Sequence, residues 1–427
     1  MIWTLSSRAF CSAYCRASLQ TTFIKVQNVK FSGLSQLSRN TRNYVTRRNL
    51  FSILGKSFSR PTETLAINAC ATGNVRAKKI VGLWLMGCSG MVFGAVVLGG
   101  ITRLTESGLS MVTWKLLGEK LPTSPEQWES EFNRYKEFPE FKMKNSSMTL
   151  EEFKWLWWME YAHRTWGRCI GAFFLLPATL FWYKGWFSSP MKKRVIAFAA
   201  LIAAQGLMGW YMVKSGLEED RFQSQSEVVR VSQYRLASHL ALAFILYTGF
   251  LWAALDHLIP ALKPATLAPG ARAFRMMAHS CKGFAFLTAI SGAFVAGLDA
   301  GLVYNSFPKM GDNWIPKEIM SLAPTISNFT ENPVTVQFDH RVLGTTTLCL
   351  ISALWILSRK RRLPLRAYTA VNALATMAWV QVGLGITTLL WYVPVSIAAL
   401  HQSGSLILLS FAVWLTHELK HVKRFVK

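Results

Sequence analysis

The sequence predicts an all-helical membrane protein with eight transmembrane helices, arranged as two pseudo-symmetric four-helix bundles. The chain has 427 residues, of which 51% are hydrophobic and 13% aromatic. Eight apolar runs approach about 20 residues, which is enough for a helix to cross a hydrocarbon core of about 30 Å. The same polar motifs also occur in the same order in the two halves of the chain. The first two observations predict the membrane class, and the third predicts the repeat.

The apolar runs set the expected helices, in chain order. The fifth and sixth runs are short, so we expect these two helices to extend into the flanking loops. The runs lie at residues 80–101, 165–183, 195–213, 236–255, 283–298, 342–357, 367–391 and 395–416.

Charge predicts the orientation of these helices. The formal net charge is +25, but the basic residues gather at the N-terminus and in short loops between apolar runs. This pattern is typical of a membrane protein and argues against nucleic-acid binding. Nearly all of the 22 acidic residues lie in the segments after the first, third, fifth and seventh runs. Short basic loops stay on the side of the membrane from which the protein is inserted. Both termini, including a tail at 418–427, are therefore expected on that side, which in a mitochondrion is the matrix side.

The start of the chain predicts the compartment. Residues 1–62 contain no Asp or Glu and are rich in Arg, Ser and Thr, which is typical of a mitochondrial transit peptide. A disordered basic tail is the alternative. The seven cysteines form no CxxC motif, which disfavours a disulfide framework or a zinc site. We therefore expect a multi-pass protein of the mitochondrial inner membrane.

An internal repeat divides the remaining chain into halves at 75–260 and 270–417. Because each half has an even number of runs, both halves insert in the same sense, as in a parallel repeat. A site could then form between facing helices of each bundle. The repeated motifs are HRxxG at 163–167 and 340–344, QxxxG at 205–209 and 381–385, and a single histidine, His239 or His401.

Four histidines are the candidate metal ligands. His163, His239, His340 and His401 all fall in the first turns of runs that go from the outer side inward, so they are expected at similar depth. Ionisable residues inside membrane helices are costly and usually functional. Two imidazoles from different helices can hold a haem iron on both faces, which pairs the first two histidines and the last two. Interfacial histidines or another kind of metal site are the alternatives.

Neighbouring residues extend this interpretation. Gly167 and Gly344 lie one turn below a histidine, where a porphyrin edge could approach closely. Arg164 and Arg341 follow the first histidine of each half and could meet haem propionates.

Glu160 lies three residues before His163, whereas the matching position before His340 is Gln337. A carboxylate beside one site allows proton or cation chemistry there, although a Glu–Arg pair at a helix start is an equally good explanation.

Aromatic residues also gather before the second run. Trp155, Trp157, Trp158 and Tyr161 are interpreted as an interfacial belt, with a rim for a lipid-like substrate as the alternative.

Four stretches resemble the haem A synthase family. They are GGITRLTESGLSMVTWK at 99–115, EYAHRTWGR at 160–168, AAQGLMGWYMVKSGL at 203–217 and FDHRVLG at 338–344. The resemblance covers roughly residues 75–417. The ordered set of four histidines, together with the ExxHR stretch, makes it specific.

The resemblance implies an oxidoreductase that converts the C8 methyl of haem O to a formyl group, giving haem A for cytochrome c oxidase assembly. His340 and His401 would ligate a haem B cofactor in the C-terminal half, and His163 and His239 would bind the substrate haem O. Glu160 matches the family's essential glutamate. Candidate partners are haem O synthase, which is a farnesyltransferase, and a matrix ferredoxin; a homo-oligomer is left open. Many bacterial members carry a cysteine pair in the first outer loop, but residues 102–160 here contain no cysteine.

Two other functions compete with this interpretation. A di-haem b-type electron carrier would place haems on both sides of the membrane, whereas these four histidines fall on one side. A non-enzymatic haem chaperone or transporter would bind haem weakly at the same histidines.

Overall fold

The computed structural model describes residues 61–217, 230–260 and 271–421. The chain divides into two compact units, 1–67 and 68–427, and the second contains everything discussed below. Nearly all of the predicted transit peptide lies outside the described residues, as does most of the predicted tail.

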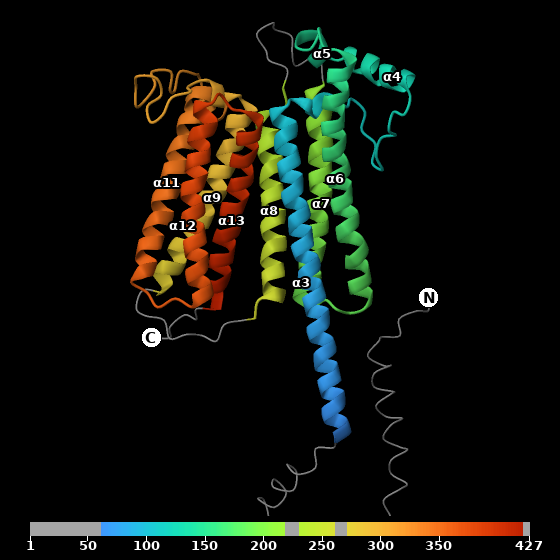
Figure 1. Cartoon of the computed structure of the whole chain (residues 1–427), viewed down its shortest axis with the longest axis vertical. Helices are drawn as coiled ribbons and strands as arrows, with labels where there is room; N and C mark the ends of the chain where they lie inside the picture. The colour runs from blue at the N-terminus through green and yellow to red at the C-terminus, as the bar shows by residue number, and fades with distance from the viewer. Residues whose placement is uncertain (1–60, 218–229, 261–270, 422–427) are drawn as a thin grey trace, which may run out of the picture. The chain divides into compact units, whose positions relative to one another are not determined.

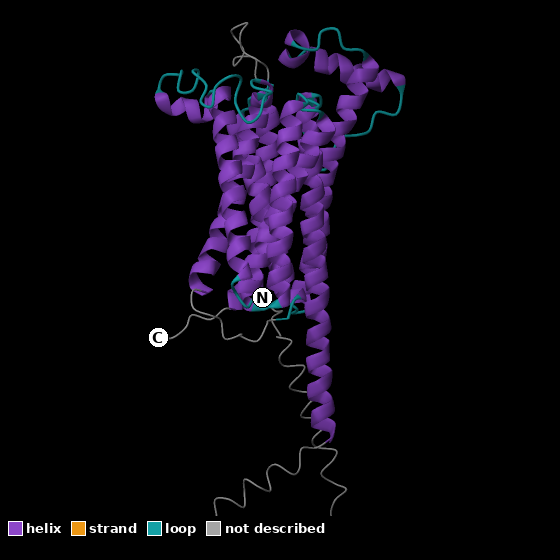
Figure 2. Cartoon of the chain, turned by 60° about the vertical axis from the view of Figure 1, so that its left-hand side comes forward, coloured by secondary structure: helices purple, strands orange, loops and turns teal. Residues whose placement is uncertain are grey.

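The described residues form helices joined by turns and loops, without any strand element, which confirms the all-helical prediction. Short helices lie in the connecting segments: α4 (Pro125–Lys136), α5 (Pro139–Met143) and α10 (Asn328–Glu331). The long helices, drawn in Figures 1 and 2, are α3 (Pro61–Leu104), α6 (Leu150–Tyr183), α7 (Ser189–Gly216), α8 (Gln233–Leu258), α9 (Ala271–Gly297), α11 (Pro333–Arg359), α12 (Leu365–Leu390) and α13 (Val395–Glu418).

Seven of these long helices are apolar enough to cross a membrane: residues Val75–Leu104 of α3, and α7, α8, α9, α11, α12 and α13. The fifth and sixth predicted runs extend into their flanking loops, as expected. The helix that does not qualify is α6, which carries Glu160, Arg164 and Arg168 before its apolar last 15 residues. The prediction of eight spans is therefore confirmed for seven.

The start of α6 explains why it is longer than the predicted run. Thr149 caps the helix, because its hydroxyl accepts from the Glu152 N–H while the Glu152 carboxylate accepts from the Thr149 N–H, 2.8 Å away. His163 consequently lies more than three turns into α6. The expectation that it falls in the first turns was wrong, since a strong capping signal upstream of the apolar run fixes the helix start.

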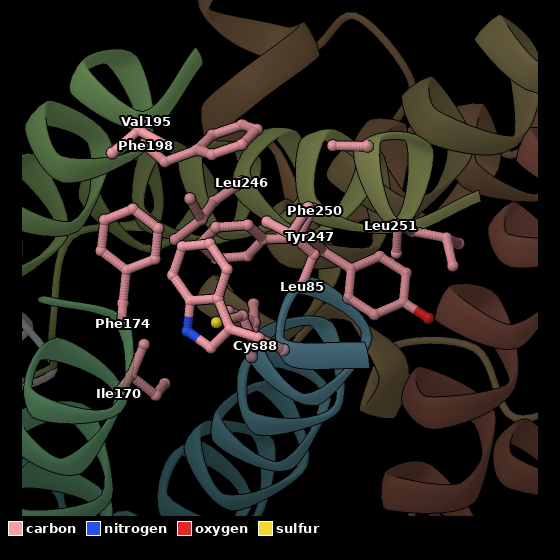
Figure 3. Close-up of a cluster of buried hydrophobic side chains, with 14 of the residues drawn as sticks. Leu85, Cys88, Ile170, Phe174, Val195, Phe198, Leu246, Tyr247, Phe250 and Leu251 are labelled. Carbon is pink, nitrogen blue, oxygen red and sulfur yellow. The ribbon is translucent and has the colours of Figure 1, made fainter. Parts of the chain in front are cut away.

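The long helices pack around two buried apolar clusters. One cluster joins α3, α6, α7 and α8, and the other joins α9, α11 and α12; both also include residues of α13. Figure 3 shows the first cluster, where Leu85 and Cys88 of α3 face Phe174 of α6 and Phe250 of α8. Because α13 contributes to both clusters, the two halves of the chain share one continuous packed interior.

Several helices begin at the same end of the bundle. In Figure 1, α6, α8, α11 and α13 start at the end that also carries α4, α5 and the segment between α9 and α11. These four helices carry the four candidate histidines. The common end is therefore where a site built from them must lie.

The aromatic group at the start of α6 is not a simple interfacial belt. Trp157 is 1% exposed and stacks on Tyr161 at 5.0 Å between ring centres, with Trp128 of α4 edge-on at 5.1 Å. Only Trp155 and Trp158 are exposed. The belt prediction was wrong for Trp157, because the first turns of α6 hold α4 against the bundle.

Candidate functional site

Each candidate histidine faces a glycine of the helix that precedes it. A Cβ at Gly99 of α3 would lie 2.8 Å from Cε1 of His163, and one at Gly292 of α9 would lie 3.1 Å from Cε1 of His340. Both glycines lie five residues before their helix ends. The absence of a side chain therefore lets the imidazole lie directly against the neighbouring backbone.

The second histidine of each half also faces a glycine, but the distance between the glycine and the imidazole differs between the two halves. A Cβ at Gly385 of α12 would lie 2.8 Å from Cε1 of His401. The matching distance from Gly209 of α7 to Cε1 of His239 is 3.8 Å, which is ordinary van der Waals contact. Three of the four imidazoles thus occupy space that only glycine leaves free.

His340 and His401 come together across the C-terminal half. Their ring centres are 6.4 Å apart and the ring planes are nearly perpendicular, at 88°. Iron–nitrogen bonds of about 2 Å, plus about 1 Å from each nitrogen to its ring centre, would place two axial imidazoles about 6 Å apart. The observed separation fits a haem iron between these two rings.

His163 and His239 belong to the N-terminal half and contact its own glycines. Their Nδ1 atoms are both buried and have no hydrogen-bond partner among the described residues. The pairing of histidines within each half, predicted from the repeat, is consistent with this arrangement, and the assignment of ligands remains a prediction.

Two glutamines hold the second histidine of each half. Gln205 Nε2 donates to the His239 carbonyl at 3.1 Å, and Gln381 Nε2 donates to the His401 carbonyl at 2.8 Å. The sequence analysis singled out neither as a site residue, although the repeated QxxxG motif was a signal that could have found them. The glutamine fixes the next helix, and the glycine one turn later accommodates its imidazole.

Glu160 and Arg164 form a buried ion pair beside the first site. Arg164 Nε lies 2.5 Å from Glu160 Oε1, and the two side chains are 6% and 5% exposed. The other guanidinium nitrogens donate to the Thr113 carbonyl at 2.6 Å and the Met111 carbonyl at 2.8 Å. Arg164 therefore fixes both the carboxylate and the loop that follows α3.

In the C-terminal half, the corresponding arginine contacts a neutral amide, Gln337, instead of a carboxylate. Arg341 donates to the Tyr304 carbonyl at 3.0 Å and to Gln337 Oε1 at 3.2 Å. Gln337 in turn donates to the Ala300 carbonyl at 2.9 Å. Both arginines are thus engaged with loop backbone, in addition to any contact with propionates.

The loops that the arginines hold begin with matching turns. Glu106 and Asp299 both adopt the left-handed conformation, with φ of 55° and 53°, and each precedes a short 3₁₀ turn. Asp299 also pairs with Arg103 at 2.7 Å, which joins the two halves at this end. The two turns have similar sequences, ESGL at 106–109 and DAGL at 299–302, a signal that could have revealed this repeat.

The glycines one turn below the histidines differ in their surroundings. A Cβ at Gly167, Gly171 or Gly344 would meet nothing within 4 Å, which leaves room for a flat ring. Gly404, however, packs against Gln381, whose Oε1 would lie 2.3 Å from a Cβ. Gly404 therefore serves helix packing.

Paired imidazoles fit a haem iron better than a zinc ion. Among residues the structure describes, no group of three or more His, Cys, Asp or Glu side chains could hold a metal ion. The available donors are pairs of imidazoles, and two axial ligands complete the coordination of a haem iron, whereas zinc needs more protein ligands.

These features define a polytopic membrane protein with paired histidines in two repeated halves. The chain belongs to the cytochrome oxidase assembly protein family COX15-CtaA, whose model matches residues 82–413. It is 56% identical over 350 residues to "Heme A synthase COX15" of Homo sapiens, covering 82% of this chain and 84% of that protein. With the Arabidopsis thaliana protein of the same name it shares 44% over 420 residues, 98% of this chain and 91% of the relative.

One relative is fused to a ferredoxin. The "Heme A synthase-mitochondrial ferredoxin fusion protein" of Schizosaccharomyces pombe is 40% identical over 384 residues, which cover 82% of this chain and 61% of the fusion.

Proposed function

We propose that this protein is a haem A synthase, which oxidises the C8 methyl of haem O to a formyl group and so supplies haem A for cytochrome c oxidase. Family membership and relatives of that name at 56% and 44% identity support the activity. The observation that carries the proposal is the 6.4 Å approach of His340 and His401, repeated in outline by a second pair beside a buried carboxylate.

The two pairs take different haems in this proposal. His340 and His401 hold haem B, which supplies one-electron chemistry when bound. His163 and His239 hold haem O, since only this pair lies on the same half as the ionisable Glu160. That carboxylate, fixed by Arg164, is placed to accept a proton or to stabilise positive charge during oxidation of the methyl group. Arg341 fixes the loop over the haem B site in the same way.

The membrane arrangement follows from the same repeat. We propose that α6 is the eighth span, because its second half, after Arg168, is apolar and packs into the first buried cluster. The eight helices then form two four-helix bundles related by a parallel repeat, with both termini in the matrix. A mitochondrial inner-membrane location agrees with the acid-free leader at 1–62 and with the eukaryotic relatives.

A ferredoxin is the electron donor that the comparisons favour. In one relative, a haem A synthase and a mitochondrial ferredoxin are parts of a single chain, so the proposed donor and acceptor are covalently linked. A matrix ferredoxin would contact this protein at the basic end, remote from the acidic loops. Haem O synthase remains a proposed partner for delivery of the substrate.

Haem extraction and chromatography test the proposal. We expect the purified wild-type protein to contain haem B together with haem O or haem A. His340→Ala should lose haem B, and His163→Ala should keep haem B and lose the other haem. His279→Ala is the control, because His279 is exposed near the opposite end of α9.

Other outcomes of this experiment decide between functions. Haem B alone in the wild-type protein would favour a di-haem electron carrier. Haem that dissociates during purification would favour a chaperone or transporter. A folded protein without any haem would overturn the proposal.

A further inference from the structure

A serine on α9 contacts the first histidine of the C-terminal pair. Ser291 Oγ lies 2.7 Å from His340 Nδ1, and Ser291 also donates to the Thr288 carbonyl at 2.8 Å. The residue after it is Gly292, against which the same imidazole packs. The ring is therefore held at Nδ1 by the serine and at Cε1 by the glycine.

The two contacts of Ser291 favour one tautomer of His340. A hydroxyl has one hydrogen, and the Thr288 carbonyl is an acceptor for it at 2.8 Å. With its hydrogen placed there, the serine oxygen accepts from His340, and we infer that Nδ1 carries the proton. Nε2 is left with a lone pair, which is the form of imidazole that binds a metal. Hydrogen bonds of this kind orient metal-bound imidazoles and make them stronger ligands.

The matching histidine of the N-terminal half has no such partner. The residue before Gly99 is Leu98, which offers no side-chain acceptor. His163 Nδ1 is buried and has no partner within the described ranges, and the same is true of His239 Nδ1. In the C-terminal half, Nδ1 of His401 accepts from Gln381 Nε2 at 3.1 Å, which is a different arrangement from that of His340. Within the described ranges, both rings of the C-terminal pair thus have a hydrogen bond and neither ring of the N-terminal pair has one.

We propose that Ser291 is a positioning residue, whose contact makes His340 a ligand that retains its haem. Leu98 provides no such contact, and His163 is therefore a ligand from which haem can exchange. This inference rests on the proposed function. A cofactor haem must stay bound through many turnovers, whereas a substrate haem must enter and its product must leave. An imidazole whose Nδ1 has no hydrogen bond to fix its tautomer is a weaker ligand, and such weak ligation suits the exchanging site.

The test is the transfer of haem from the purified protein to excess apomyoglobin, together with the midpoint potential of the retained haem B. Ser291→Ala should speed the loss of haem B about 10-fold or more and raise its potential, because the iron loses electron donation from a hydrogen-bonded imidazole. Ser291→Thr, which keeps the hydroxyl, should restore both. Ser358→Ala is the matched control, since Ser358 is buried near the opposite end of α11 and bonds a carbonyl three residues back, at 2.6 Å.

The complementary variant adds the missing partner. Leu98→Ser should slow the transfer of haem O or haem A out of the N-terminal half and increase the amount that co-purifies. If Ser291→Ala matches Ser358→Ala in both transfer rate and potential, the inference is overturned while the proposed function stands. If the His340→Ala variant keeps the haem B that the wild-type protein contains, the assignment of His340 as a ligand fails, and this inference fails with it.

Discussion

The two halves of the chain contain the same set of helices and differ in a few polar side chains. In both, an imidazole packs on a glycine, a glutamine holds the next histidine's backbone, and an arginine holds the loop above. The N-terminal half has a buried carboxylate, Glu160, three residues before its first candidate histidine, where the other half has Gln337. Among the four candidate histidines, only the rings of the C-terminal pair have hydrogen bonds to other described residues. Duplicated geometry thus provides two pairs of histidines, and single substitutions give their surroundings different chemistry.

The largest expected effect comes from removing the charge that distinguishes the halves. Glu160→Gln makes the first site resemble the second, and we expect haem A formation to fall about 100-fold or more, because a positioned acid or base contributes that much. Haem B content should stay unchanged. The measurement is the ratio of haem A to haem O formed in cells that express the variant.

Glu131→Gln makes the same chemical change in α4, where Glu131 pairs only with Arg134 at 2.9 Å, and serves as the control. Haem A formation at the wild-type rate in Glu160→Gln would remove Glu160 from the proposed chemistry.

A smaller effect is expected from the glycines that the repeat places against the second histidines. Gly385→Ala puts a Cβ 2.8 Å from the His401 ring, so the imidazole must move and haem B content should fall several-fold. In Gly209→Ala the added Cβ would lie 3.8 Å from Cε1 of His239, so this variant should keep the haem of the N-terminal half. Pyridine haemochrome spectra of the two purified variants make the comparison.

Equal haem loss in the two glycine variants would show that helix packing in general, and not the contact with the ring, determines retention.

The smallest effect concerns the segments that cover the two sites. Glu140 of α5 is 4% exposed and accepts from the Tyr135 hydroxyl at 3.1 Å, and burial raises its pKa to about 7. The corresponding segment of the other half is held by neutral amides, with Asn332 donating to Asn328 at 3.0 Å. A pH-dependent stability is therefore expected from the first segment.

The sign follows from the raised pKa. The unfolded chain releases the Glu140 proton near its ordinary pKa of 4.5, whereas the folded protein keeps it to about pH 7. This contribution to stability is full below pH 4.5 and is lost as the pH rises through 7. Glu140→Gln should flatten the fall in melting temperature between pH 5.5 and 8, and at pH 8 it should stabilise the protein by about 1–3 kcal/mol. A wild-type melting temperature that does not change over this range would contradict the expectation.

Much of the site could be predicted because its signals are local in sequence. Apolar runs predicted all eight long helices, and the ordered motifs predicted which histidines share a half. The start of α6 was not predicted, although the Thr149–Glu152 capping box that fixes it is local in sequence. The burial of Trp157 was not predicted because it depends on the short helix α4, which packs against the first turns of α6. Ser291 escaped detection for a similar reason: it resembles any other serine until His340 of another helix lies beside it.

The sequence by itself determined the class of protein, the number of long helices and the four histidines, because hydropathy and motif spacing act within one helix. The tertiary structure decided how each imidazole is held. The contact of His340 with Ser291, the glycine behind each ring and the use of Arg164 on loop carbonyls depend on the rotation and depth of neighbouring helices. Those quantities are set by packing between residues far apart in the chain, which no local pattern records.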